Sequence, residues 1–258
     1  MLTLSTAGVV QLFLVFSRIS AFTFSAPVFS HRSVPVQWRI FFSLFLAYTL
    51  TLVLPLQLPP SYTHPLGLLV AASREVLTGL LLGFAVQFIF WAVQFAGEVI
   101  GFQVGLTLAQ VYDPASGTRA NPLGRFLIVS LTLLFLLLDG HHQVIEGLAA
   151  SFRIIPLAGG EIAASGPLLL QWIGQLFATA LRLAAPFMLT ILIVDASLAV
   201  FVRMVPQADL FSIALPLKLI LGLTLTLFFV KIFFEYTPLL LDTLVDQLRA
   251  MIEALASL

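Results

Sequence analysis

The stretch LGLLVAASREVLTGLLLGFAVQFIFWAVQFAGEVIGFQVGLTLAQV, residues 66–111, decides the fold class of this chain. Apolar side chains dominate its 46 residues. A single helix of that length, rising about 1.5 Å per residue, would be about 69 Å long, roughly twice the hydrocarbon core of a bilayer. Because tilt alone does not absorb a twofold excess, the block forms either a helical hairpin or a helix that extends well beyond a membrane.

The rest of the chain has the same character. Further apolar blocks occupy approximately residues 7–29, 40–58, 123–138, 168–202 and 210–234, and joints rich in Pro and Gly separate them. Of the 258 residues, 60% are hydrophobic and 9% charged, against about 45–50% and 25% in a typical soluble domain. We therefore predict an all-α, membrane-associated bundle of long, broken helices and helical hairpins.

Composition and motifs exclude several kinds of function. Twelve Lys and Arg balance twelve Asp and Glu, so no strongly basic surface is available for nucleic acid. The chain has no cysteine, and it contains no phosphate-binding glycine loop and no ordered set of catalytic nucleophile, base and acid. We predict a non-enzymatic protein without a metal or cofactor.

The C-terminal segment, from Pro238 onwards, is amphipathic. Apolar residues recur at helical spacing at Leu241, Leu244, Leu248, Met251, Ile252 and Leu255. Charged residues occupy the other face at Asp242, Asp246, Arg249 and Glu253. With Thr237 as N-cap and Pro238 at the first helical position, the pattern predicts a separate helix that docks on protein or lies at an interface.

Several charges fall inside the apolar blocks, namely Arg18, Glu98, Arg182, Asp195, Lys218 and Lys231. A charge at the centre of a bilayer costs about 2.5–3.5 kcal/mol on insertion scales. The long stems of Lys218 and Lys231 can carry their ammonium groups to an interface. The other charges are expected to face protein, water or a partner charge rather than lipid.

Glu98 shares a helical stripe with small and amide residues. On a helix, Gln87, Gln94, Glu98, Gly101 and Gly105 fall within about 60° of one another. Gly97 precedes Glu98. Gly97, Gly101 and Gly105 recur every four residues and form a ridge of small residues, which lets helix backbones approach closely. The stripe predicts tight packing within the chain, a contact seam against other subunits, or a water-lined passage.

A second polar group interrupts the sequence LLFLLLDGHHQVIEGLAASF, residues 133–152. Asp139, His142 and Glu146 have the spacing of one helical face, and Gly140 and His141 lie between the first two. This is not the His-Glu-x-x-His zinc pattern. We predict a hydrogen-bonded polar network rather than a metal site, and we extend the set of buried polar residues to Arg182 and Asp195. A proton-relay role is the alternative.

Four segments in order give the chain a family resemblance. They are FSRISAFTFSAPVFSHRSVPVQWR, GEVIGFQVGLTLAQVYDPASG, LLFLLLDGHHQVIEGLAASFRIIPL and VPQADLFSIALPLKLILGL. They resemble the FliR family of flagellar export-gate proteins, whose relative in virulence secretion is the SctT group. The resemblance covers nearly the whole chain.

The resemblance implies a fold and a set of partners. Residues 1–166 would form a FliP-like helical part, and residues 167–258 a FliQ-like helical hairpin with the amphipathic C-terminal helix. The chain would join FliP-type and FliQ-type subunits in a closed channel for unfolded flagellar proteins. That channel would lie in the bacterial inner membrane within the flagellar basal body, in contact with lipid and with FlhB-type and FlhA-type proteins.

The resemblance also assigns a role to one loop. The segment after the GEVIGFQVGL helix would help to plug the channel. In this chain it comprises Leu106, Thr107, Leu108, Ala109, Gln110, Val111 and Tyr112.

Three other functions remain open on the residues alone. One is a secondary transporter with a midplane site on broken helices, built from Arg182, Pro186 and Asp195. Another is the equivalent subunit of a virulence secretion system. The third is a membrane scaffold without a passage.

Overall fold

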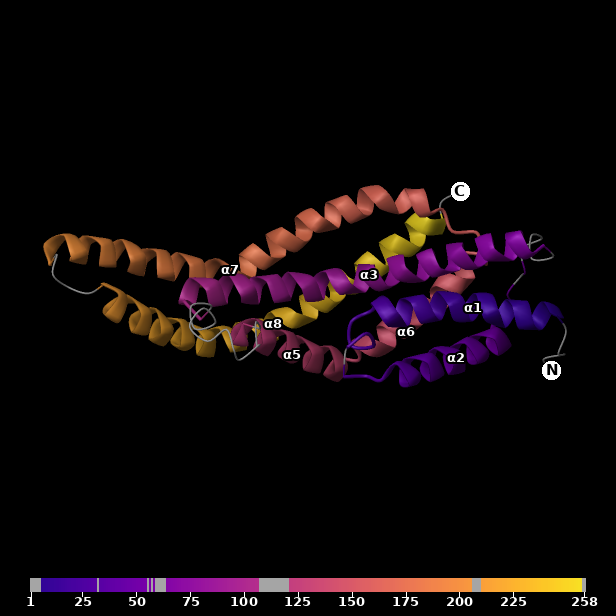
Figure 1. The fold of residues 1–258 in the computed structure, drawn as a ribbon, viewed down its shortest axis with the longest axis horizontal. Coiled ribbons are helices and arrows are strands. Elements are labelled where there is room, and N and C mark those ends of the chain that lie inside the picture. Colours follow the sequence, from indigo (N-terminus) through magenta and orange to yellow (C-terminus); the bar gives the residue numbers. More distant parts are fainter. Residues whose placement is uncertain are drawn as a thin grey trace. The chain divides into compact units, whose positions relative to one another are not determined.

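The computed structural model describes residues 6–31, 33–54, 56, 58, 64–106, 121–205 and 210–256 of the chain. This part is helical and contains no strand (Figure 1). Its elements are α1 (Thr6–Ser25), α2 (Val36–Val53), α3 (Pro65–Val104), α5 (Pro122–Leu137), α6 (Gly140–Ile154), the short 3-10 helix η3 (Ile162–Ala164), α7 (Ser165–Met204) and α8 (Leu210–Ala256). The predicted all-α fold is confirmed.

Three of the helices are unusually long. α3 and α7 have 40 residues each, and α8 has 47, so each is about 60–70 Å long at 1.5 Å per residue. Among the two forms predicted for the block at 66–111, the described residues adopt the long helix rather than the hairpin. In that part of the chain, α1, α2, α3, α7 and α8 are each long and apolar enough to cross a membrane, and α5 with α6 would form a sixth span.

The prediction that a separate helix starts at Thr237 is wrong. α8 continues through Pro216 and Pro238. The hydroxyl of Thr237 donates to the carbonyl of Phe233 at 2.8 Å, so it bonds back into the preceding turn instead of capping the next one. The two faces of the tail nevertheless follow the predicted spacing, because the six apolar residues from Leu241 to Leu255 are buried and the four charged ones are exposed.

The chain forms two compact units, each assembled from separated segments. The first contains Met1–Ile89, Asp139–Ile173 and Leu241–Leu258, and the second contains Phe90–Leu138 and Gly174–Leu240. The boundary therefore passes through α3, α7 and α8 and does not follow the linear division at residue 166. The FliP-like and FliQ-like parts stay a prediction.

In the first unit, α1 packs along α2 (Figure 1). Phe29 stacks on Phe42 with ring centroids 5.5 Å apart, and the buried hydroxyl of Ser43 donates to that of Thr23 at 3.1 Å. On another side of α1, Gly79 of α3 lies directly against the carbonyl of Arg18. That close approach leaves no room for a larger residue at position 79.

In the second unit, aromatic rings connect the helices. Phe90 of α3 meets Phe135 of α5 edge to face at 5.7 Å, and Phe187 of α7 meets Phe229 of α8 at 5.2 Å. Such edge-to-face pairs stabilise a packed core beyond the area that they bury.

Candidate functional site

The best-defined feature near the predicted channel loop is the contact between the end of α3 and the start of α5. Gly97 lies against the backbone of Gly124, and Gly101 lies against the side chain of Asn121, closely enough that a Cβ at either α3 position would collide. The glycine ridge thus serves packing within this chain at Gly97 and Gly101. It brings the backbones of α5 and α3 together at Gly97 and leaves space for the side chain of Asn121 at Gly101.

Asn121 is the buried residue that joins the two helices. Its Oδ1 accepts a hydrogen bond from the backbone N–H of Leu123 at 3.0 Å and thereby caps the N-terminus of α5. Its Nδ2 donates to the carbonyl of Gly97 at 2.7 Å. Pro122 then occupies the first position of α5, where a missing N–H does no harm. The Asn-Pro pair is the signal in the sequence that could have identified this anchor.

Gly105 ends α3. It adopts φ +89°, and α3 ends at the residue before it. The N–H of Leu106 bonds to the carbonyl of Gly101 at 3.0 Å, and the N–H of Gly105 bonds to that of Phe102 at 3.1 Å. These two bonds form a Schellman motif, which requires a left-handed residue. Gly105 is therefore the helix stop, and a Cβ at this position would also crowd the side chain of Leu215 in α8.

The two described residues on either side of the segment 107–120 contact the same glycine. Leu106, at the start of the predicted channel loop, bonds to the carbonyl of Gly101, and Asn121, after the end of that loop, packs on the same glycine. Of the residues assigned to the plug, Leu106 is half-buried, and Thr107 to Tyr112 lie outside the described residues.

The polar members of the stripe lie in different surroundings. Glu98 is exposed, and its carboxylate lies against Gly124 in the first turn of α5, where the positive end of the helix dipole favours a negative charge. Gln94 is also exposed. Gln87 is half-buried, and its Oε1 is buried without a hydrogen-bond partner among the described residues. A seam against other subunits at Glu98 and Gln94 stays a prediction.

Among the described residues, a buried ionic site lies elsewhere, around Arg18. This residue is fully buried, and its Nε and Nη2 donate to Glu75 Oε2 at 2.6 Å and to Oε1 at 3.0 Å. The guanidinium also donates to the carbonyls of Ser151 and Ile155 at 3.2 and 3.4 Å, and it lies 4.3 Å from the ring centroid of Phe152. Arg18 is thus shielded by its own chain.

The partner carboxylate, Glu75, fixes a turn as well. Its Oε1 accepts from the N–H of Ala158 at 2.6 Å, and Arg74 next to it donates to the carbonyl of Ala158 at 3.1 Å. Ala158 has φ +60°, an uncommon conformation for an alanine that these two contacts hold. Glu75 was missed among the charges in the apolar blocks. A carboxylate inside the longest block was the signal that could have found it.

The predicted buried polar network is wrong for the single chain. Asp139, His142, Glu146 and Arg182 are exposed, and Asp195 is partly exposed. Asp139 and His142 form a pair at 3.0 Å with both side chains 71% exposed, whereas Asp195 pairs with Lys218 at 2.5 Å. The first three residues belong to one compact unit and the last two to the other. Helical spacing predicts which residues share one face of a helix. It does not show whether that face is buried in the protein or points outward.

Asp139, His141 and His142 bring together groups that could ligate a metal ion, with one ligand atom from each within 4.8 Å of the others. Asp139 adopts φ +57° at the break between α5 and α6. Its carboxylate, however, is hydrogen-bonded to Nδ1 of His142, and Nδ1 of His141 has no partner among the described residues. A histidine that ligates a metal normally has its other ring nitrogen held by a hydrogen-bond partner. We interpret the group as a polar helix start.

The sequence is also similar to known proteins. The sequence pattern of the family described as bacterial export proteins, family 1, matches residues 9–244. The flagellar biosynthetic protein FliR of Bacillus subtilis (strain 168) is 31% identical over 245 residues, which cover 93% of each chain. The protein of that name from Escherichia coli (strain K12) is 34% identical over 81% of this chain and 79% of its own. The one from Aquifex aeolicus (strain VF5) is 30% identical over 84% of each. This protein therefore belongs to the bacterial export proteins, family 1, the family of the FliR proteins.

Proposed function

We propose that this protein is a non-enzymatic subunit of the flagellar type III protein-export gate in the bacterial inner membrane. The observation that carries the proposal is the likeness, over 93% of the chain, to a relative named for flagellar biosynthesis. With FliP-type and FliQ-type subunits, the chain would form the closed channel through which unfolded flagellar proteins leave the cytoplasm. FlhB-type and FlhA-type proteins would be further partners.

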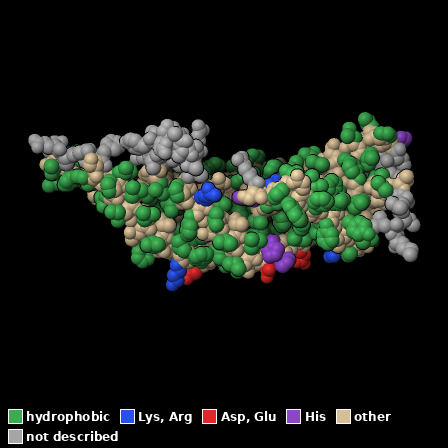
Figure 2. Space-filling view, turned by 60° about the horizontal axis from the view of Figure 1, so that its bottom comes forward, with side chains coloured by type: hydrophobic (Ala, Val, Ile, Leu, Met, Phe, Trp, Pro, Cys, Tyr) green, Lys and Arg blue, Asp and Glu red, His purple; other side chains and the backbone are tan. Residues whose placement is uncertain are grey.

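The exposed apolar faces of the long helices support the proposal that the chain is part of a larger assembly. Hydrophobic side chains cover most of the face shown in Figure 2, and the charged ones are few. Large apolar residues of α7 that are exposed in the single chain include Leu170, Leu189, Leu192, Ile193 and Val200, and those of α8 include Ile220, Leu227, Phe228 and Ile232. A large exposed apolar patch on a protein indicates contact with lipid or with another protein.

The contacts that Gly101 makes beside the predicted channel loop support the plug assignment. Leu106, the first residue of the predicted plug, and Asn121, which follows the plug in the chain, both contact Gly101. Loops that are positioned by rigid helices or sheets often carry the functional residues of a protein. In the gate, residues 106–112 would narrow the channel.

The alternatives find less support. A transporter site on a broken helix requires an interruption near Pro186, but α7 continues through this residue from Ser165 to Met204. The relatives described above are named for flagellar biosynthesis, which favours the flagellar over the virulence branch.

Co-expression tests the proposal. The full chain would be produced with the FliP-type and FliQ-type proteins of the same bacterium, and the purified particle weighed by native mass spectrometry. The expected result is one hetero-oligomer that contains all three chains. A stable, monodisperse single chain that ignores both partners would count against the proposal. Restored swimming in a strain without its own FliR-type protein gives an independent measure.

A further inference from the structure

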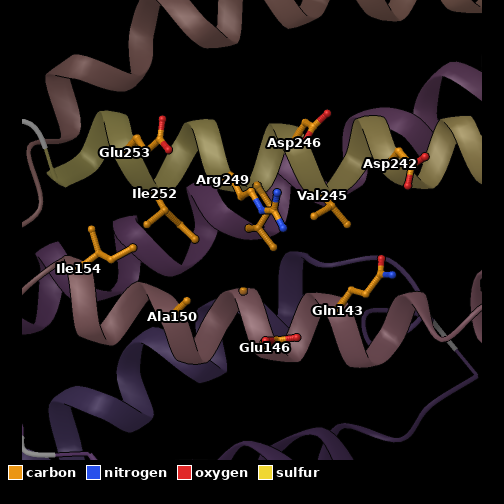
Figure 3. A pocket seen from close by; sticks show the side chains of 12 residues that line it. Gln143, Glu146, Ala150, Ile154, Asp242, Val245, Asp246, Arg249, Ile252 and Glu253 are labelled. Carbon is orange, nitrogen blue, oxygen red and sulfur yellow. The ribbon is translucent and has the colours of Figure 1, made fainter.

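An open groove runs between α6 and the C-terminal part of α8, within the first compact unit (Figure 3). Its volume is about 870 Å³. The residues that line it are Gln143, Glu146, Gly147, Ala150 and Ile154 of α6 and Asp242, Val245, Asp246, Leu248, Arg249, Ile252 and Glu253 of α8. The two helices run in the same direction, since Gln143 and Asp242 lie at one end and Ile154 and Glu253 at the other.

The length of the groove suits a helix. Residues 143–154 of α6 and 242–253 of α8 each extend for about 17 Å at 1.5 Å per residue, or three helical turns. Close packing of Gly147 on Leu248 holds the two walls together at the base. The floor between them is apolar, with Ala150, Val245 and Ile252. Such a floor accepts the apolar stripe of an amphipathic helix.

The rim of the groove is acidic. Glu146, Asp242, Asp246 and Glu253 contribute four carboxylates, all on exposed residues, and Arg249 contributes the one lining cation. Arg249 extends from α8 toward α6 (Figure 3). Within the described part of the chain, it forms no ion pair with any of the four carboxylates. The rim thus keeps an excess negative charge that favours a cationic partner.

We propose that this groove binds an amphipathic helix of about three turns from a partner protein, with Lys or Arg along its edges and an apolar stripe on its inner face. The acidic rim repels anionic lipid headgroups, and a small polyamine would leave the apolar floor in water. Only a ligand with both features matches the floor and the rim together. The proposal rests on the proposed function for the setting of this partner, namely the export apparatus.

The first test uses the full chain in neutral detergent micelles and a synthetic probe. The probe is a fluorescent helical peptide of about 15 residues with Lys and Leu on opposite faces. The variant Glu146→Gln/Asp246→Asn/Glu253→Gln should weaken its binding about tenfold, and added salt should weaken binding to the unaltered chain. Ala150→Phe, which fills the floor and keeps every charge, should also weaken it.

The control variant removes three carboxylates that do not line the groove, by Asp139→Asn/Glu161→Gln/Glu235→Gln. All three residues are exposed, and the shared micelle cancels any partition of the peptide into detergent. The control should bind like the unaltered chain. Equal loss in the groove and control variants, or unchanged binding in Ala150→Phe, would show general charge attraction and overturn the proposal.

The second test finds the partner in the assembled complex. Since the chain has no cysteine, Ala150→Cys carries a photoreactive maleimide at one known site. Mass spectrometry of the cross-linked peptide should identify a helical segment with Lys or Arg beside apolar residues, and this product should fade in the three-carboxylate groove variant. A cross-link to an acidic segment or to lipid would refute the groove proposal. Restored swimming with such a result would leave the export function intact, so the two failures are distinguishable.

Discussion

Arg18 of α1 and Glu75 of α3 form a two-pronged ion pair inside the first compact unit, with the two side chains 0% and 1% exposed. Two charges removed from water stabilise a fold only when their remaining hydrogen-bonding groups find partners as well. Here the carbonyls of Ser151 and Ile155 and the N–H of Ala158 complete the set. The pair therefore ties α1, α3 and the turn after α6 into one body.

Removal of one partner should destabilise the chain strongly. Glu75→Leu leaves the guanidinium of Arg18 buried and uncompensated, which costs about 3–5 kcal/mol. Arg18→Met/Glu75→Leu should recover most of this loss, because no buried charge remains. Thermal unfolding of the purified chain in one detergent measures both. A double variant no more stable than Glu75→Leu would contradict the coupling between the two residues. Asp195→Asn, at a pair whose carboxylate is 45% exposed, should cost less than about 1 kcal/mol.

The sequence could predict the helices better than the faces that they bury. Apolar block length and breaker residues identified the all-α fold, because both act locally. The spacing of Leu241, Leu244 and Leu248 likewise predicted the buried side of the tail. The role of Glu75 depends on Ala158, more than 80 residues away, and no local pattern reports such a contact. The helix start predicted at Pro238 was wrong because a local signal was ambiguous. Proline is typical of a helix start, but it also occurs inside a helix when neighbouring turns accommodate it.

Crowding at Gly101 should make even a small substitution harmful. A Cβ at this position would collide with the side-chain amide of Asn121, so Gly101→Ala should push α5 away from α3 and lower the thermal midpoint and the yield of folded protein. Gly174, in the interior of α7, has nothing within 4 Å of an added Cβ. Gly174→Ala should stabilise its helix by about 1 kcal/mol. Equal effects of the two substitutions would refute the packing role of Gly101.

Asn121 has two functions that substitutions can separate. Asn121→Ala removes the cap of α5 and leaves the carbonyl of Gly97 without its 2.7 Å donor, for a loss of about 2–3 kcal/mol. Asn121→Asp keeps an acceptor for the N–H of Leu123 and removes the donor. It should retain the α5 cap and still lose part of the stability. Chemical denaturation measures the free energy of unfolding, which should be highest for the wild type, lower for Asn121→Asp and lowest for Asn121→Ala. A result in which Asp equals wild type would mean that the bond to Gly97 contributes nothing.

Pro238 distinguishes one continuous α8 from two helices that meet at Thr237. Inside a helix, proline withholds an N–H from the carbonyl four residues before it, here Phe234, and strains the turn. Pro238→Ala should therefore stabilise the chain by about 1–3 kcal/mol, seen as a higher thermal midpoint. Pro65 stands at the first position of α3, where proline is already suited to the helix, so Pro65→Ala should leave the midpoint unchanged or lower it slightly. If both substitutions gave the same small change, Pro238 would behave as a helix start, and the tail from residue 238 would be a separate helix after all.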